Sequence, residues 1–103
     1  MSRSEVSGEA ATLFLSAFAR RQGLSAIALA NEDGLLVSGA GEGVDLDALA
    51  AMTVAPDDDR RAWNPSARAF DLHFQSAKLT LGTLGPVSSV GEAARALGRI
   101  LGA

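Results

Sequence analysis

Hydrophobic and small residues fill most of residues 25–41, and the rest of the chain is organised around this stretch. Residues 26–30 are apolar without a break, and residues 35–40 are again apolar or small. The polar sequence Asn-Glu-Asp-Gly at residues 31–34 separates the two runs and is typical of a type I turn closed by a left-handed glycine. The pattern predicts a β-hairpin. Its first strand is apolar on both faces, so we expect the sheet to be covered on both sides.

The predicted turn also sets a register for this hairpin. It places Leu29 opposite Val37 and Ile27 opposite Gly39. One face then carries the bulky residues Ile27, Leu29, Leu35 and Val37, and the other carries Ala26, Ala28, Ala30 and Leu36. Because one face is bulky and the other is mostly alanine, we expect helices to pack on them at different distances.

Apolar residues at helical spacing predict three helices. The first covers residues 5–22 and stops at Gly23, a residue suited to the position after a helix. The second starts at the N-cap Asp45 and ends by about residue 54, ahead of Pro56. The third starts at the capping box of residues 89–92. Their apolar stripes are Ala10, Leu13, Phe14, Ala17 and Phe18; Leu46, Leu49, Ala50 and Thr53; and Val90, Ala94, Leu97, Ile100 and Leu101.

Strict alternation of apolar and polar residues predicts a second hairpin over residues 69–84. A tight turn at Ser76-Ala77 would place Phe74 opposite Leu79. The same register pairs Leu72 with Leu81, His73 with Thr80, and Gln75 with Lys78. One face is apolar and the other wholly polar, so we expect the polar face to meet water or a wet interface.

A charged segment bounded by prolines, residues 56–68, lies between the second helix and this hairpin. It reads as a loop that could hold one short strand around residues 61–64. Trp63, the only tryptophan, lies within it. Two interpretations of Trp63 stay open from the residues alone: a lid over the edge of the core, or an exposed anchor at an interface, where tryptophan often dominates binding.

Composition narrows the function. A chain of 103 residues with 48% hydrophobic content suits one domain with one core. The absence of cysteine excludes disulfides, thiol catalysis and cysteine-based zinc sites. We expect a cytoplasmic protein, because neither a signal-peptide core nor an apolar run long enough to span a membrane is present. The net charge of −3 argues against a nucleic-acid partner.

The charges are unevenly distributed along the chain. Residues 22–59 contain eight acidic residues and no Lys or Arg, whereas residues 60–103 contain six basic and two acidic residues. This asymmetry fits either an ordinary solvated surface or a two-sided surface suited to recognising a partner.

Motifs that would carry chemistry are incomplete. His73 has no activated serine of the G-x-S-x-G type to work with. The glycine-rich residues 39–43 lack the Lys and Ser/Thr of a phosphate-binding loop, and residues 57–59 lack the glycine and final glutamate of a calcium loop. We therefore expect no enzyme activity, no cofactor and no metal site.

Residues 14–38 resemble the opening of Roadblock/dynein-light-chain domains: a helix ending near glycine, an apolar strand, an Asp-Gly turn and a second strand. Residues 45–52 resemble the start of that family's second helix, and residues 81–84 with the following Gly/Ala/Leu-rich helix resemble its end. The resemblance implies one α+β domain over residues 1–103, in the order α-β-β-α-(β)-β-β-α. Its antiparallel sheet of four or five strands would have the first and third helices on one face and the second helix on the other.

The resemblance also implies a function. Members of the family are non-catalytic, form dimers, and scaffold or regulate small Ras-like GTPases, including bacterial ones in polarity and motility systems. The expected partner is a small Ras-like GTPase or another Roadblock-like protein, with homodimerisation. The alternative is a profilin-like sensor of small molecules, which would need a preformed pocket between sheet and helix.

Two features depart from the family: the second helix is short, and the usual third strand is missing or reduced to part of residues 56–68. Residues 69–75 would then form an edge strand open to pairing with a second copy. The family builds partner contacts in this region, so we predict that Trp63 is buried at an interface. The predicted interface residues are Trp63, Asp71, His73, Gln75, Asp45, Leu49 and Met52.

Overall fold

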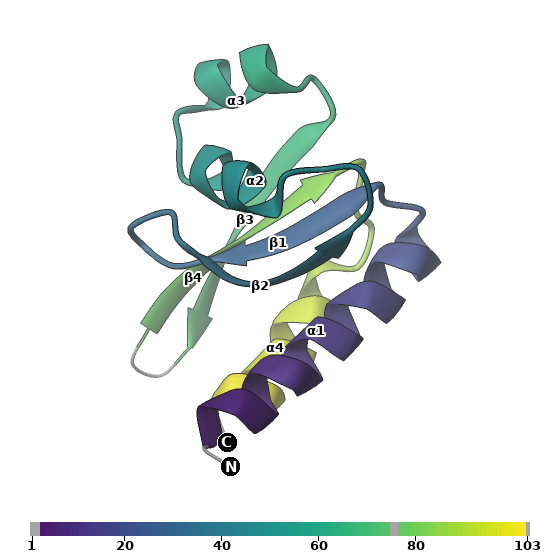
Figure 1. The fold of residues 1–103 in the computed structure, drawn as a ribbon, viewed down its shortest axis with the longest axis vertical. Helices are drawn as coiled ribbons and strands as arrows, with labels where there is room; N and C mark the ends of the chain where they lie inside the picture. The colour runs from purple at the N-terminus through teal and green to yellow at the C-terminus, as the bar shows by residue number, and fades with distance from the viewer. Residues whose placement is uncertain (1–2, 75–76, 103) are drawn as a thin grey trace.

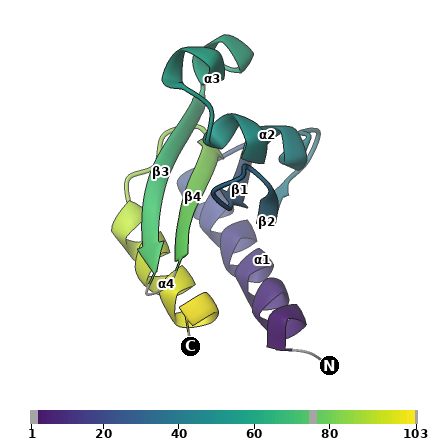
Figure 2. The ribbon, with the colours of Figure 1, turned by 90° about the vertical axis from the view of Figure 1, so that its left-hand side faces the viewer.

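A computed structural model describes residues 3–74 and 77–102 and shows a sheet covered by helices on both faces (Figure 1). The elements are α1 (Arg3–Gln22), β1 (Ala26–Ala30), β2 (Leu36–Gly41), α2 (Leu46–Thr53), α3 (Asp57–Trp63), β3 (Ala67–Phe74), β4 (Ala77–Leu84) and α4 (Val90–Gly102). The described strands form one antiparallel sheet in the order β2-β1-β4-β3. Helices α1 and α4 lie together on one face, and α2 lies on the other (Figure 2). The predicted fold class is confirmed.

Helix α1 ends as predicted but packs on a different stripe. Gly23 takes a left-handed φ of 71°. Its N–H donates to Arg20 O, and the next N–H, of Leu24, donates to Ala19 O, which together form a Schellman cap. The buried side chains are Ala11, Leu15, Phe18 and Ala19. The predicted stripe was therefore wrong in part, since Leu13 and Ala17 are exposed. Residues 10–19 are apolar on more than one side of the helix, so spacing alone does not select the buried side.

The first hairpin has the predicted turn. Gly34 N–H donates to Asn31 O, and Gly34 is left-handed at a φ of 79°. The Asn31 side chain adds two bonds, because its Oδ1 accepts from the N–H groups of Asp33 and Leu35 at 2.9 and 3.0 Å. These bonds hold the backbone in the turn, as expected of asparagine at its first position.

The predicted register of this hairpin is wrong beyond the turn. Ala30 pairs with Leu36, as the turn requires, but Leu29 pairs with Ser38 and Ile27 with Ala40. A β-bulge inserts Val37 between these pairs and shifts every later pair by one residue. Val37, assigned to the buried bulky face, is consequently exposed. Leu35, assigned to the same face, precedes the strand and the bulge and is also exposed.

The two faces of the sheet differ as the alternation predicted. Ile27, Leu29, Leu72 and Leu81 pack with α1 and α4 in a core of bulky residues. On the opposite face, Ala26, Ala28 and Ala30 pack with Leu49 and Ala50 of α2. The alanine face admits α2 close to the sheet. Thr53 lies so near β4 that a Cβ on Gly82 would come within 1.8 Å of its Oγ1.

Residues 57–63 form helix α3, which corrects the prediction of a loop with a short strand. Pro56 precedes the helix, Asp57, Asp58 and Asp59 occupy its first turn, and Arg60 and Arg61 its last. Acidic residues at the start and basic residues at the end both interact favourably with the helix dipole. The sheet therefore keeps four strands in the described residues, and α3 stands where the family resemblance implied a further strand.

The second hairpin has the predicted faces but a different register. Leu72 pairs with Leu79, His73 with Lys78 and Phe74 with Ala77, two residues away from the predicted pairing. A shift of two residues leaves every side chain on its original face, so the alternation could not distinguish the two registers. The predicted turn used Ala77, which instead belongs to β4. Residues 75–76 lie outside the described residues.

Candidate interaction surfaces

Arg60 holds the corner where α2 meets α3. Its side chain is about nine-tenths buried, and its Nη1 donates to the backbone oxygens of Thr53 at 3.4 Å and Ala55 at 3.0 Å. Its Nη2 pairs with the Asp57 carboxylate. These carbonyls belong to the end of α2 and the segment after it, where a helix leaves backbone oxygens without partners. Arg60 therefore caps α2 and fixes α3 beside it.

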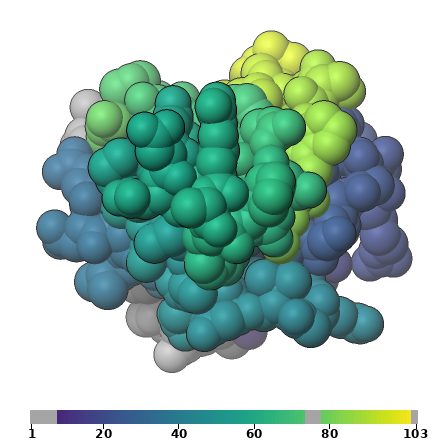
Figure 3. Space-filling view, turned by 90° about the horizontal axis from the view of Figure 1, so that it is seen from above, coloured from purple at the N-terminus to yellow at the C-terminus, as the bar shows by residue number. Residues whose placement is uncertain are grey.

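The outer strand β3 lies next to this corner. Helix α3 contacts both α2 and β3. Seen from above, the teal residues around α3 occupy the middle of this face (Figure 3). Trp63 at the end of α3 is 39% exposed, and Asp71 and His73 are exposed on β3. The structure thus places Trp63 on α3, and Asp71 and His73 on the neighbouring strand β3. Since β3 is an outer strand of the sheet, the predicted edge strand is confirmed. Gln75, the other predicted interface residue of this strand, lies outside the described residues.

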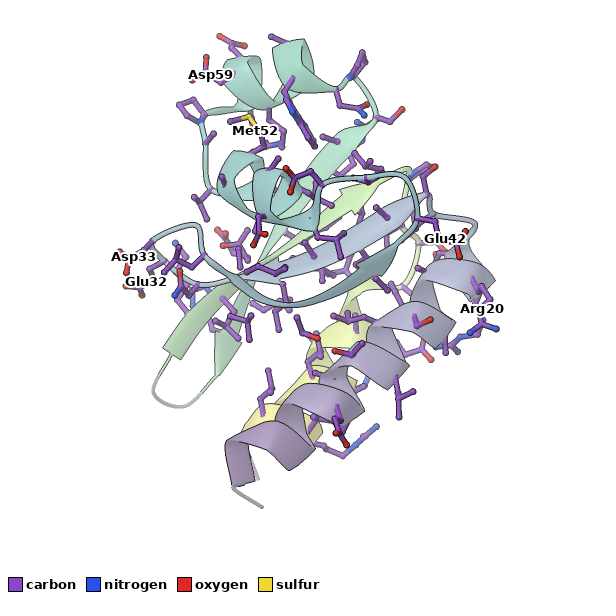
Figure 4. The ribbon with its side chains drawn as sticks, in the orientation of Figure 1. Arg20, Glu32, Asp33, Glu42, Met52 and Asp59 are labelled. Carbon is purple, nitrogen blue, oxygen red and sulfur yellow. The ribbon has the colours of Figure 1, made fainter. Side chains whose placement is uncertain are left out.

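The three predicted interface residues of α2 have different surroundings. Asp45 is exposed, and its carboxylate accepts a hydrogen bond from the N–H of Ala48 at 3.2 Å, as an N-cap does. Met52 is half-buried, and Figure 4 shows its side chain between α2 and α3. Leu49 is completely buried against the alanine face of the sheet. Its side chain belongs to the core of the protomer, so it can affect a surface contact only by positioning α2.

A polar hollow of about 510 Å³ lies between the α2–α3 corner and the open face of β3 and β4. Its charged lining residues are Glu32, Asp57, Asp71, Arg60 and Lys78. Arg60 is already engaged by backbone oxygens and Asp57. Sites for small organic ligands are usually mostly apolar, which this lining is not.

Among the residues that the structure describes, no group of three or more His, Asp or Glu side chains is arranged to hold a metal ion. None of the described helices combines the length and apolarity needed to cross a membrane. His73 stands on the exposed face of β3 opposite Lys78.

The residues that sequence reasoning missed are those of the α2–α3 corner. Proline followed by three aspartates is a helix-start signal, since both proline and acidic residues favour the first turn. Residues 56–59 carry that signal. Burial of Arg60 has no comparable signature, because Arg60 and the exposed Arg61 are adjacent and chemically identical.

Comparison with solved structures places this arrangement among known folds. The structure matches Myxococcus xanthus MglB with a TM-score of 0.64 at 13% identity, over 91% of this chain and 89% of the other. It matches the gliding protein MglB from Thermus thermophilus with a TM-score of 0.58 at 16% identity, over 91% and 90% of the two chains. An MglB structure described as having a tetrameric arrangement matches with a TM-score of 0.59 at 18% identity, over 91% and 89%.

The chain has the Roadblock-like fold of MglB. This confirms the resemblance drawn from residues 14–38 at the level of the fold. No protein-family model matches the chain, and no curated protein matches its sequence. Within this Roadblock-like fold, the α2–α3 corner and the β3 edge are where the chain departs from the pattern that the resemblance implied.

Proposed function

We propose that this chain is a non-catalytic, cytoplasmic interaction module. It acts as a homodimer and binds a small Ras-like GTPase or another Roadblock-like protein in a bacterial polarity or signalling system. The match to MglB over 91% of the chain is the observation that carries this proposal. The whole chain, residues 1–103, acts as one such module. The exposed β3 edge with the neighbouring α3 supplies the surface for dimerisation.

Affinity capture tests the partner directly. The tagged chain is used as bait in its native cell extract, once with a GTP analogue and once with GDP, and bound proteins are identified by mass spectrometry. We expect a small Ras-like GTPase, enriched in one nucleotide state, or a second Roadblock-like protein. Recovery of neither class would count against the proposal.

Dimerisation through β3 follows from its open edge, because the outward N–H and C=O groups of an edge strand can pair with another strand. Two copies related by a two-fold axis would pair antiparallel and continue the sheet across both protomers. We expect light scattering at micromolar concentration to show a dimer that Asp71→Lys and His73→Glu weaken. Glu42→Lys, directly after the strand β2 at the opposite edge of the sheet, is the matched control. A monomer, or a dimer insensitive to both β3 variants, would exclude this edge.

Trp63 would lie beside the same seam. Its exposure of 39% in the protomer leaves indole surface available to a partner. We expect Trp63→Ala to weaken association by about 2 kcal/mol, as for a central aromatic anchor, while changing the free energy of unfolding much less. Loss of folding with association unchanged would assign Trp63 to the protomer core instead.

The polar hollow beside the α2–α3 corner supports a second candidate, a profilin-like sensor of small polar molecules. Its lining combines acidic and basic groups, as recognition of a zwitterion would require. A thermal-shift screen with nucleotides and metabolites tests this candidate, with Lys78→Met as the variant expected to lose any shift. Absence of a shift with every compound would eliminate it.

A further inference from the structure

The strand β2 forms the edge of the sheet opposite β3, and its chemistry differs from that of β3. Its sequence, Leu-Val-Ser-Gly-Ala-Gly, contains no charged residue and no proline. Strand β3 instead carries Arg68, Asp71 and His73. Proteins commonly protect an open edge with charged side chains or proline, because its outward N–H and C=O groups can pair with any extended chain. Beyond its bulge, β2 lacks this protection.

A groove runs between β2 and α1. One hollow, of about 660 Å³, is lined by Gly8, Glu9, Thr12, Leu13 and Val37. A second, of about 600 Å³, continues toward the end of the strand, where Ser16 and Arg20 face Ala40, Gly41 and Glu42. Between them Thr12 and Ser38 share a hydrogen bond of 2.7 Å. This bond joins α1 to β2, so the groove consists of two hollows, one on either side of it.

Exposed apolar residues gather at the first part of the groove. Leu13 is 73% and Val37 43% exposed, and both line the first hollow. Leu35, just before β2, is 62% exposed. These are three of the five large hydrophobic residues exposed among the described side chains. An extended chain paired with β2 could cover them with its own apolar side chains, as in recognition by strand addition.

The ends of the groove are mainly acidic. Asp33 lies at the turn before β2, and Glu42 follows the strand at its other end, near Arg20 (Figure 4). Glu9 lines the first hollow. Among the residues that line the two hollows, Arg20 is basic and both Glu9 and Glu42 are acidic, so acidic side chains outnumber basic ones. An uncharged centre with acidic ends complements a segment that is apolar in its middle and basic at its ends.

We propose that β2 and the α1 groove bind an extended segment of a partner protein, with apolar residues at alternate positions flanked by Lys or Arg. A second copy of β2 is a poorer occupant. Antiparallel pairing about a two-fold axis would bring Asp33 of one protomer to the Glu42 end of the other, and like charges placed together oppose association.

A synthetic probe tests this site. The probe is a fluorescein-labelled peptide of alternating valine and threonine between pairs of lysines, and its control carries glutamates in place of the lysines. We expect the lysine peptide to bind in a salt-sensitive manner and the glutamate peptide to bind at least about tenfold more weakly. In two further peptides, either every valine or every threonine is N-methylated. Because alternate N–H groups point to the same edge of a strand, each modification removes the hydrogen-bond donors from one edge of the peptide. Pairing with β2 requires that only one of them loses binding.

Variants locate the contact. We expect Leu13→Glu, on the exposed face of α1, and Val37→Glu, on the strand, each to weaken binding about tenfold or more. Ala62→Glu, on the exposed part of α3, changes the net charge by the same amount as these variants and should leave affinity within about twofold. Leu13→Glu keeps the test decisive even if Val37→Glu fails to fold.

Each contrary result overturns the site. These results are no binding of the lysine peptide, equal binding of the lysine and glutamate peptides, equal binding of the two N-methylated peptides, or an unchanged affinity of Leu13→Glu. Self-association that Leu13→Glu abolishes would assign the groove to a second copy of the chain. The proposal does not rest on dimerisation through β3, which Asp71→Lys and His73→Glu test at the opposite edge, so the two can fail independently.

Discussion

Replacing Gly82 by alanine probes the close approach of α2 to the sheet. A Cβ at this position would come within 1.8 Å of Thr53 Oγ1, and within 3.0 and 3.1 Å of Thr53 Cβ and Cγ2. Relief requires either that α2 moves away or that Thr53 changes rotamer and gives up its 2.6 Å hydrogen bond to Leu49 O. Overpacking of this kind typically costs about 1–3 kcal/mol. A smaller gain from restricting the unfolded chain, about 0.4–1 kcal/mol, offsets part of it.

Thermal and urea unfolding followed by circular dichroism measure this cost. We expect Gly82→Ala to lower the melting temperature by roughly 4–8 °C for each kcal/mol lost. Gly8→Ala is the matched control, since a Cβ there meets nothing within 4 Å and helix α1 should gain up to about 1 kcal/mol.

A double-mutant cycle identifies Thr53 as the source of the clash. Thr53→Ala removes the two side-chain atoms beyond Cβ. The loss of stability in the double mutant should therefore be smaller, by about 1 kcal/mol or more, than the sum of the losses in the two single mutants. Strict additivity, or equal effects of Gly82→Ala and Gly8→Ala, would refute the inferred contact between α2 and β4.

Three further predictions concern the polar contacts that shape the chain. Arg60→Met should lower the free energy of unfolding in urea by about 1–3 kcal/mol, because the backbone oxygens that Arg60 caps lose their donor. The exposed Arg61→Met should change it by no more than about 0.5 kcal/mol. Equal effects of the two variants would show that the cap is unimportant. Asn31→Ala should cost about 1 kcal/mol through the two lost turn bonds, and an unchanged urea midpoint would contradict that. Asp45→Ala should cost about 1 kcal/mol as a lost N-cap, and more than Asp47→Ala in the same helix; the reverse order would argue against the cap.

Local signals in the sequence predicted the elements that depend on local chemistry. The turn at residues 31–34, the Gly23 cap and the Asp45 cap each have a polar or conformational reason contained within a few residues, and all three are present. Both hairpin registers were wrong for a different reason. The bulge at Val37 and the two-residue shift between β3 and β4 depend on how whole strands pack, and the alternation of side chains is compatible with more than one solution.

The candidate surfaces could be predicted only in part. The alternation of residues 70–73 placed Asp71 and His73 on the exposed face of an edge strand, where they lie. The family resemblance assigned Leu49 of the second helix to an interface, although the alanine face draws α2 close enough to bury it completely. The sequence pattern did not predict the exposed groove beside Leu13, because α1 is apolar on two sides. Packing against α4 and β2 decides which of these sides faces the sheet.

The uneven charge along the sequence acquires a meaning once the sheet order is known. Three acidic residues of the segment before residue 60, Glu32, Asp33 and Glu42, flank β2. The acidic first turn of α3 belongs to the same segment but lies beside β3, together with the basic residues Arg61 and Arg68. Because β2 and β3 are the outer strands, the turns that flank β2 put mainly acidic charge at one edge of the sheet, whereas the other edge carries charges of both signs. The β3 edge, with charges of both signs, can pair with a copy of itself, while the acidic ends of β2 oppose that pairing. A dimer joined through β3 would therefore leave both β2 grooves free, one at each end of the continuous sheet, for a basic extended segment of a different protein.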